Sequence, residues 1–200
     1  MKNAIVNSLM DNVSKYKNFN DVKLKEIRYG IESFYLTITK TVVIFTLSYI
    51  CGTFKTLLLL MIFYTLLRLN GFGLHAKKSW QCWLGSIILF LIVPYLCLHL
   101  YIGKSFMIII SLFCLIFIFK YAPADTEKRP IVNRKKRLIH KSLCILTTIA
   151  YILIIYLLKD LYLCNIIFFS IFIETVMILP LSYKIFRLKY DNYKHYLFEH

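Results

Sequence analysis

The chain has 200 residues, of which 59% are hydrophobic, 16% aromatic and only 18% charged. Soluble domains are roughly 45–50% apolar and about 25% charged, so the composition excludes a soluble globular enzyme, a disordered chain and a basic nucleic-acid-binding domain. Lys and Arg nevertheless number 25 against 10 Asp and Glu, which leaves a formal net charge of +15. A chain this apolar has to place that charge at the ends of membrane segments.

Residues 1–33 are polar and of mixed charge, unlike the short basic leader of a secreted protein. Two sets of apolar residues repeat there at helical spacing: Ile5, Leu9, Val13 and Tyr16, then, after the plausible N-cap Asp21, Leu24, Ile27, Ile31 and Phe34. This periodicity is typical of amphipathic helices that lie at an interface. We expect either a collar on the membrane surface or a docking surface for a second amphipathic helix.

Six apolar stretches follow, at 34–51, 56–69, 82–102, 105–120, 138–158 and 161–181. A helical crossing needs about 20 residues, which the third, fifth and sixth stretches meet comfortably. The first stretch crosses the membrane if the Lys40 side chain snorkels or faces protein. The second is short and could cross thinly or re-enter, and the fourth is long enough to cross only with its flanking residues. The sequence predicts an all-α integral membrane protein with about six transmembrane or partly re-entrant helices. Four full spans with two re-entrant pieces is the alternative.

The basic residues alternate between the connections. The N-terminal region, the second and fourth connections and the C-terminal tail together hold 21 of the 25, whereas the remaining connections hold Lys55, Lys104 and Lys159. Because basic connections stay in the cytoplasm, both termini are expected there. The chain then divides into an interfacial region at 1–33, a polytopic membrane domain at 34–183 and a cytoplasmic tail at 184–200.

The six cysteines show no CxxC or zinc-ligand spacing, and most lie deep in apolar stretches, where Cys behaves as a small hydrophobic residue. Cys82 differs, because it opens the third stretch just after a basic connection that also contains His75. A helix N-terminus or a neighbouring imidazolium lowers a thiol pKa, and imidazole can carry the proton during acyl transfer. The alternative is an ordinary amphiphilic loop.

Spacing limits how His75 and Cys82 can cooperate. On one straight helix, seven residues rise about 10.5 Å, which is too far for a shared hydrogen bond. The backbone must therefore fold back between the two residues, and Gly71 and Gly73 provide the flexibility ahead of His75. Asn70 and Gln81 are the nearby polar residues that could orient the imidazole.

A second polar stretch runs from Tyr121 to Arg137, with Pro123 and Pro130 on either side of a short turn and a basic run after it. One interpretation is topological, since a positive connection holds the orientation of the protein. The other is an electrostatic site for an acidic partner or for lipid head groups.

Two motifs carry a family resemblance: Arg68, Gly71, Gly73, His75, Ala76, Cys82 and Ser86 read as R-x2-G-x-G-x-H-A-x5-C-x3-S, and Ala122–Thr126 with Pro130 form the proline turn. With these motifs, its length and its hydrophobic architecture, most of the chain resembles the accessory gene regulator B family, the membrane cysteine endopeptidases of Gram-positive quorum sensing and virulence regulation. The chain departs from the family pattern at Glu127, which precedes Lys128 and Arg129 where family members can carry a basic run.

The resemblance implies a thiol protease of the bacterial cell membrane that cleaves the C-terminal tail of a small amphipathic AgrD-like pro-peptide. By that analogy Cys82 is the nucleophile and His75 its general base and acid. Arg68, Gly73 and Ser86 support the active site. Lys128 and Arg129 match basic positions tied to substrate processing. A Cys82 thioester would then be captured within the peptide, giving the thiolactone or lactone ring of an autoinducing peptide.

The expected partners are that pro-peptide and an anionic bilayer, with a homodimer as an open alternative and no nucleic acid. The catalytic connection would face the cytoplasm. No metal, nucleotide or redox cofactor has a recognisable site in the sequence, so none is expected. The rival function is a small peptide transporter or exporter component without covalent catalysis, which would use Glu174 and Lys40 as intramembrane charges. A structural or partner-binding membrane subunit is the third alternative.

Alkylation of Cys82 separates these functions. We expect a thiol reagent applied from the cytoplasmic side to modify Cys82 readily, because an activated thiolate is the reactive form. Mass spectrometry of the labelled protein measures the modification. An inert Cys82 favours the transporter or the structural subunit.

Overall fold

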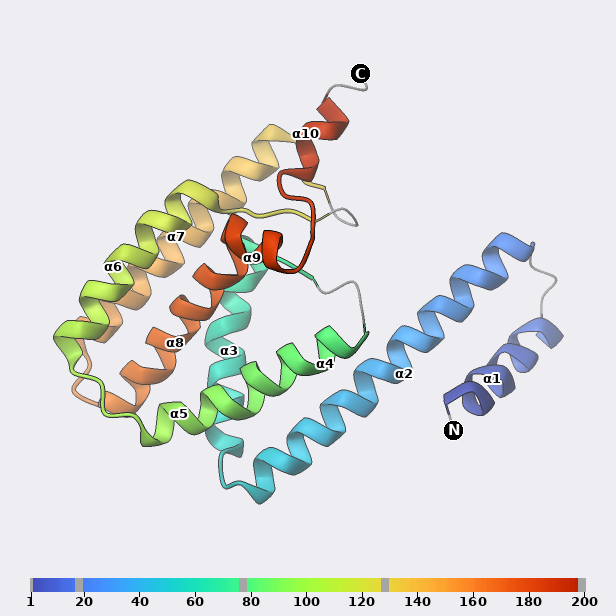
Figure 1. Cartoon of the computed structure of the whole chain (residues 1–200), viewed down its shortest axis with the longest axis horizontal. Helices are drawn as coiled ribbons and strands as arrows, with labels where there is room; N and C mark the ends of the chain where they lie inside the picture. The colour runs from blue at the N-terminus through green and yellow to red at the C-terminus, as the bar shows by residue number, and fades with distance from the viewer. Residues whose placement is uncertain (1, 17–19, 76–78, 127–129, 198–200) are drawn as a thin grey trace. The chain divides into compact units, whose positions relative to one another are not determined.

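The computed structural model describes residues 2–16, 20–75, 79–126 and 130–197, and most of these residues are helical. The chain divides into two compact units, Met1–Tyr49 and Ile50–His200. Within the described ranges there is no strand, and a parallel bridge joins Phe72 to Ala124. Figure 1 shows the helices in chain order.

The first unit contains helix α1 (Lys2–Tyr16) and nearly all of helix α2 (Asp21–Ile50). Arg28 connects the two helices, because its Nη2 donates to Asn7 Oδ1 at 3.1 Å while its Nε donates to Glu32 Oε1 at 3.4 Å. Asp21 lies in the first turn of α2, where a carboxylate complements the helix dipole. Because α2 is continuous through residue 33, the division between interfacial region and first span stays a prediction.

The second unit contains the remaining elements: α3 (Phe54–Gly71), α4 (Ser79–Ile87), the π-helical segment η1 (Ile88–Ile92), α5 (Val93–His99), α6 (Lys104–Tyr121), α7 (Arg134–Leu157), α8 (Leu161–Ile178), α9 (Pro180–Ile185) and α10 (Asn192–Leu197). Within the described ranges of the whole chain, six helices are long and apolar enough to cross a membrane. An all-α membrane protein with six such helices is therefore confirmed. The two short stretches form unbroken helices of 18 residues each, about 27 Å long, which favours crossing over re-entry.

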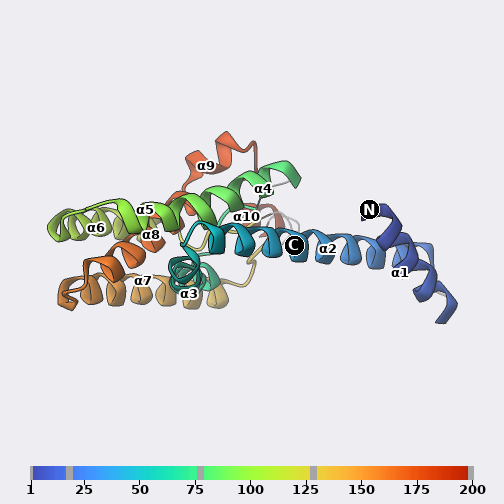
Figure 2. The same ribbon diagram turned by 90° about the horizontal axis from the view of Figure 1, so that it is seen from below.

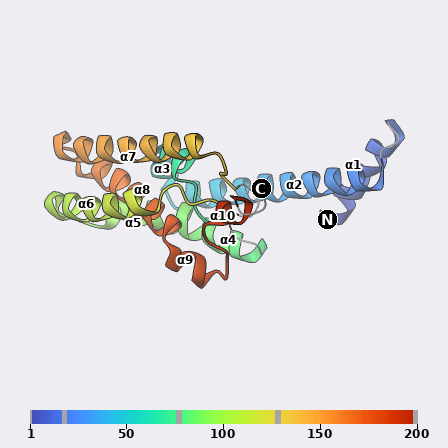
Figure 3. The ribbon, with the colours of Figure 1, turned by 90° about the horizontal axis from the view of Figure 1, so that it is seen from above.

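Helix α8 is the central element of the second unit. Figures 2 and 3 show it between α3 and α7 on one side and α5 and α6 on the other. Most of its residues are buried, including Ile166, Ile171 and Ile178, none of which is exposed to solvent, whereas Phe172 and Val176 form an exposed strip. A helix that is apolar all round and buried on most of its surface belongs in such a central position.

The third span contains a π-helical turn, η1, two residues before Pro94. Proline has no N–H and its ring displaces the carbonyl four residues before it, and here the N–H of Val93 bonds to Ile88 O, one residue beyond the α-helical partner. A π-helical turn accommodates the extra residue and redirects the helix. The span from Trp80 to His99 thus consists of α4, η1 and α5 in series.

The two ends of the helices in the second unit differ in charge. At one end Lys104 Nζ donates to the carbonyl oxygens of Tyr156 and Leu158, at 2.5 and 2.8 Å, and neutralises the negative end of α7. The connections that follow α3, α6 and α8 meet at the other end. In the sequence, these connections and the adjoining helix ends carry most of the basic residues of this unit. That separation agrees with the alternation in the sequence. The assignment of the basic end to the cytoplasm stays a prediction.

Candidate functional site

The two sequence motifs lie side by side at the basic end of the second unit. Gly73 N donates to Ala124 O at 2.8 Å, and Ala124 N donates to Gly71 O at 3.0 Å. Leu74 N donates to Met177 O at 3.1 Å, which connects the same loop to α8. The loop that leads to His75 is therefore hydrogen-bonded to both the proline turn and the last span.

The backbone of this loop requires a glycine at position 73. Gly73 has a φ of +98°, and a Cβ atom there would overlap Arg68 Nη1 and lie 2.9 Å from Met177 O. Phe72 also has a positive φ, 60°, although it is not a glycine. Such conformations cost of order 1–3 kcal/mol and persist only where the surroundings enforce them. The chain turns sharply at 72–73 because Arg68 and α8 surround it.

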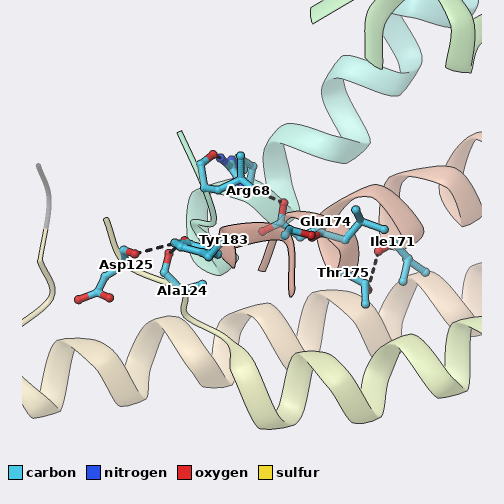
Figure 4. Close-up of polar contacts among 10 residues, drawn as sticks. Arg68, Ala124, Asp125, Ile171, Glu174, Thr175 and Tyr183 are labelled. Carbon is cyan, nitrogen blue, oxygen red and sulfur yellow. Dashed lines mark hydrogen bonds and ion pairs between the residues drawn. The ribbon is translucent and has the colours of Figure 1, made fainter. Parts of the chain in front are cut away.

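Arg68 fixes the residue that precedes His75. Its Nη2 donates to Leu74 O at 2.7 Å, and its Nη1 lies 3.8 Å from Glu174 Oε2. The Glu174 side chain is fully buried, whereas that of Arg68 is 19% exposed. Figure 4 shows the two side chains directed toward each other from α3 and α8. Arg68 Nη2 thus donates to Leu74 O, and Leu74 N donates to Met177 O. We call these two hydrogen bonds the Leu74 clamp.

The proposed catalytic residues are both exposed. His75 directly follows the Leu74 clamp, and Cys82 lies at the end of the first turn of α4. Residues 76–78 lie outside the described part of the chain, so the His75–Cys82 dyad stays a prediction. Ser86 Oγ donates to Cys82 O at 2.8 Å. This bond occupies the Ser86 hydroxyl proton within α4, so Ser86 supports the backbone at Cys82.

The proline turn is held by the C-terminal segment. The Asp125 carboxylate is buried and accepts hydrogen bonds from the N–H groups of Asn192, at 3.1 Å, and Tyr193, at 2.8 Å. Tyr183 Oη donates to the carbonyl oxygens of Ala124 and Asp125, each at 3.2 Å. Burial raises the pKa of the Asp125 carboxyl, although these donors and the Arg137 guanidinium favour its charged form. The C-terminal segment is thus hydrogen-bonded to the proline turn and holds it in place.

The basic positions expected to bind substrate, Lys128 and Arg129, lie outside the described residues. Asp125, which precedes them, accepts the N–H of Ile131, which follows them, at 3.4 Å from Oδ2. Further along the chain, Asn133 caps α7 by accepting from Lys135 N and Lys136 N, at 2.9 and 3.2 Å. A cavity of about 370 Å³ adjoins this stretch. It is lined by Phe72, Pro130, Ile131, Val132, Lys136 and His140, among others.

The other cysteines and His140 also have defined environments in the structure. Cys97, Cys114, Cys144 and Cys164 are buried, as expected for small hydrophobic residues. Cys51 is exposed like Cys82, so exposure alone does not distinguish the proposed nucleophile. His140 has a structural environment, with Nδ1 3.2 Å from Asn70 Oδ1 and its ring edge-on to Phe72. The amide oxygen of Asn70, a candidate for orienting His75, is thus engaged by His140.

Together the fold and this site define a multi-pass, all-α membrane protein in which the loop that ends at His75 is held against the last span. A family model described as Accessory gene regulator B matches residues 3–178. The chain belongs to the accessory gene regulator B family.

Similar proteins cover nearly the same length. An AgrB-like protein of Clostridium acetobutylicum is 30% identical over 197 residues, covering 96% of this chain and 94% of that protein. Accessory gene regulator protein B of Staphylococcus aureus strain MRSA252 is 32% identical over 171 residues, 86% of this chain and 90% of its own. The protein of that name from strain Newman is 30% identical over 172 residues, covering 86% and 89%. No solved structure matches the chain.

The sequence did not reveal that Glu174, Asp125 and Tyr183 hold the site in place. The partner of Glu174 is Arg68, and the only signal for it was that both are charged residues within apolar stretches. Asp125 and Tyr183 were also missed as anchors of the proline turn. A buried role for Asp125 had no sequence signal beyond its place in the turn.

Replacing Gly73 with Ala should destabilise the protein and disrupt the loop. The added Cβ would overlap Arg68 Nη1 and approach Met177 O at a positive φ, so we expect a loss of about 2 kcal/mol or more. Thermal unfolding in detergent measures this change. Gly85→Ala is the matched control, since nothing lies within 4 Å of a Cβ there and alanine is favoured in a helix by about 1 kcal/mol. Equal melting temperatures for the two variants would contradict this account of Gly73.

Proposed function

We propose that this protein is a membrane cysteine endopeptidase that removes the C-terminal tail of a small quorum-sensing pro-peptide and promotes its cyclisation. The observation that carries the proposal is the constrained loop that ends at His75, in a chain of the accessory gene regulator B family that has an exposed Cys82 at the start of a helix. A catalytic base has to be held in place, and the Leu74 clamp acts on the residue before His75.

In the proposed reaction, His75 takes the thiol proton of Cys82, and the thiolate attacks the carbonyl carbon of the scissile peptide bond. The tetrahedral intermediate collapses when the C–N bond breaks, and the imidazolium returns its proton to the leaving amine. The tail departs with a new amino terminus, and the rest of the pro-peptide remains on Cys82 as a thioester. Cys82 is exposed in the first turn of α4.

Ring closure follows by exchange. A Cys or Ser within the acylated peptide gives its proton to His75 and attacks the thioester carbonyl, which forms a thiolactone or lactone. Cys82 leaves as a thiolate, and His75 passes that proton to it. Thiolactone formation keeps the acyl group activated, so that step needs no nucleotide. The high effective concentration of an internal nucleophile lets it compete with water, and an interfacial site that limits water favours cyclisation over hydrolysis.

The pro-peptide is proposed to meet the protein at its basic end. Lys128 and Arg129, with the exposed Arg134, Lys135 and Lys136 at the start of α7, would attract an acidic tail. The amphipathic N-terminal region would contact the amphipathic part of the pro-peptide at an anionic bilayer. This arrangement places the termini and the catalytic loop in the cytoplasm, following the distribution of basic residues.

The transporter alternative receives less support. It assigns Glu174 to a pathway through the membrane, yet this carboxylate is fully buried and faces Arg68. A charge that lines a substrate path needs access to water or to the substrate. The ion pair at the end of α3 therefore favours a role in holding the loop before His75.

Replacing Cys82 with Ala should abolish tail release. Purified protein in bilayers is incubated with a candidate pro-peptide, and mass spectrometry follows the free tail, a covalent thioester on Cys82 and a dehydrated cyclic product. We expect all three signals with the wild-type protein and none with Cys82→Ala, because the bond-forming sulfur is absent. Cys51→Ala is the matched control, since Cys51 is the other exposed cysteine. Release of the tail by Cys82→Ala would refute the catalytic assignment.

Reversing the charges of Lys128 and Arg129 to Glu should weaken processing most at low salt. We expect roughly a tenfold or larger loss in kcat/KM at 0.01 M ionic strength, shrinking by 0.15 M as the Debye length falls from about 30 Å to about 8 Å. Initial rates of tail release at several salt concentrations measure the effect. The same reversal at Lys55 and Lys159, outside the basic connections, is the control. A rate unchanged at every ionic strength argues against electrostatic capture.

A further inference from the structure

Glu174 is a buried carboxylate within the most apolar part of the fold. It is not exposed at all, and neither of its carboxylate oxygens accepts a hydrogen bond within the described part of the chain. Arg68 Nη1, the nearest positive group, lies 3.8 Å away and likewise has no hydrogen-bond partner there. The contact is therefore electrostatic. Burying a charge is costly, so its retention calls for a role.

The loop opposite Glu174 leaves room for the carboxylate. A Cβ atom at Gly71 would overlap Glu174 Oε1 and lie 3.3 Å from Cys144 Sγ. A Cβ atom at Gly73 would overlap the Arg68 guanidinium. Gly71 thus faces Glu174, and Gly73 faces Arg68. Because neither glycine has a side chain, the backbone can approach the two charges closely.

The two terminal nitrogens of Arg68 serve different groups. Nη1 faces Glu174, while Nη2 donates to Leu74 O at 2.7 Å. A guanidinium is planar and rigid, so a charge that fixes one nitrogen also fixes the direction of the other. Leu74 N is held separately by Met177 O, three residues along α8 from Glu174. Both polar groups of the Leu74 backbone are therefore held by groups that α8 positions.

We propose that Glu174 is a positioning residue for His75 and acts through Arg68. Its carboxylate sets the orientation of the guanidinium, the guanidinium sets the Leu74 carbonyl, and the next residue along the chain is His75. This inference rests on the proposed function only in giving His75 a catalytic task. The effect of Glu174 on the loop is inferred from the positions of Glu174, Arg68 and Leu74 and does not depend on the proposed function.

The ion pair is better suited to orientation than to stability. A buried pair repays its desolvation only when the geometry is excellent and further hydrogen bonds satisfy both groups. Here Nη1 and both carboxylate oxygens have no such bonds among the described residues. Misplacement of a catalytic group by about 1 Å can cost a hundredfold in rate, so even a modest change in the direction of Arg68 would affect kcat.

The first arm of the test compares Glu174→Gln with Thr175→Val in bilayers. Glu174→Gln keeps the shape and removes the charge. Thr175→Val also changes a buried residue of α8. It removes a bond from Thr175 Oγ1 to Ile171 O within the same helix and an interaction with the Cys114 thiol, neither of which involves Arg68 or Leu74. We expect Glu174→Gln to lower kcat for tail release about 10- to 100-fold with KM changed less than about threefold. Thr175→Val should stay within about twofold in both constants.

Conservative variants separate positioning from a general structural role. Glu174→Asp keeps the charge and should recover part of the lost kcat. In an Arg68→Lys background, which lacks the rigid fork, Glu174→Gln should cause little further loss, because the two residues act in series. Full additivity of the two losses, or a Glu174→Gln kcat equal to wild type, overturns the proposal.

The second arm does not depend on catalysis. Hydrogen exchange followed by mass spectrometry compares the peptide containing residues 71–75 in the full-length variants. We expect at least tenfold faster exchange there in Glu174→Gln and wild-type exchange in Thr175→Val. Unchanged exchange in Glu174→Gln overturns the proposal, even if activity falls. If the wild-type protein releases no tail while Glu174→Gln accelerates exchange, the proposed function fails and the action of Glu174 on the loop stands.

Discussion

A carboxylate and a guanidinium buried together between the ends of α3 and α8 constrain everything around the candidate site. The charge of Glu174 cannot reach bulk water without parting the helices, so the adjacent loop has to adapt to this carboxylate and to the Arg68 guanidinium that faces it. The loop does so with glycine at positions 71 and 73, because a Cβ atom at either position would overlap Glu174 or Arg68. The positive φ of Phe72 follows from the same crowding. The first motif is thus a backbone shaped around an ion pair.

A second set of contacts joins the proline turn to the end of the chain. Asp125 accepts backbone N–H groups of Asn192 and Tyr193, and Tyr183 donates to the carbonyl oxygens of the turn. The proline turn is also hydrogen-bonded to Gly71 and Gly73 through the backbone of Ala124. Three segments far apart in sequence therefore form one hydrogen-bonded layer at the basic end. His75 directly follows this layer in the chain.

The sequence sufficed for the spans and the motifs, since the length and hydropathy of a membrane helix depend on local composition. It placed six spans and identified α3 and α6 as the short ones. It could not pair Glu174 with Arg68 or Asp125 with Asn192, because such pairing depends on how distant helices pack. Periodicity did indicate amphipathic helices at 1–33, but it could not show that α2 continues without a break into the first span.

The position of α8 has a consequence for biosynthesis. Its residues Glu174 and Met177 hold a loop that was made more than a hundred residues earlier, and chains are synthesised and fold from the N-terminus onward. A nascent chain that has inserted only its first five spans contains His75 and Cys82 but lacks the groups that orient the loop. Assembly of the loop that leads to His75 therefore coincides with completion of the membrane domain.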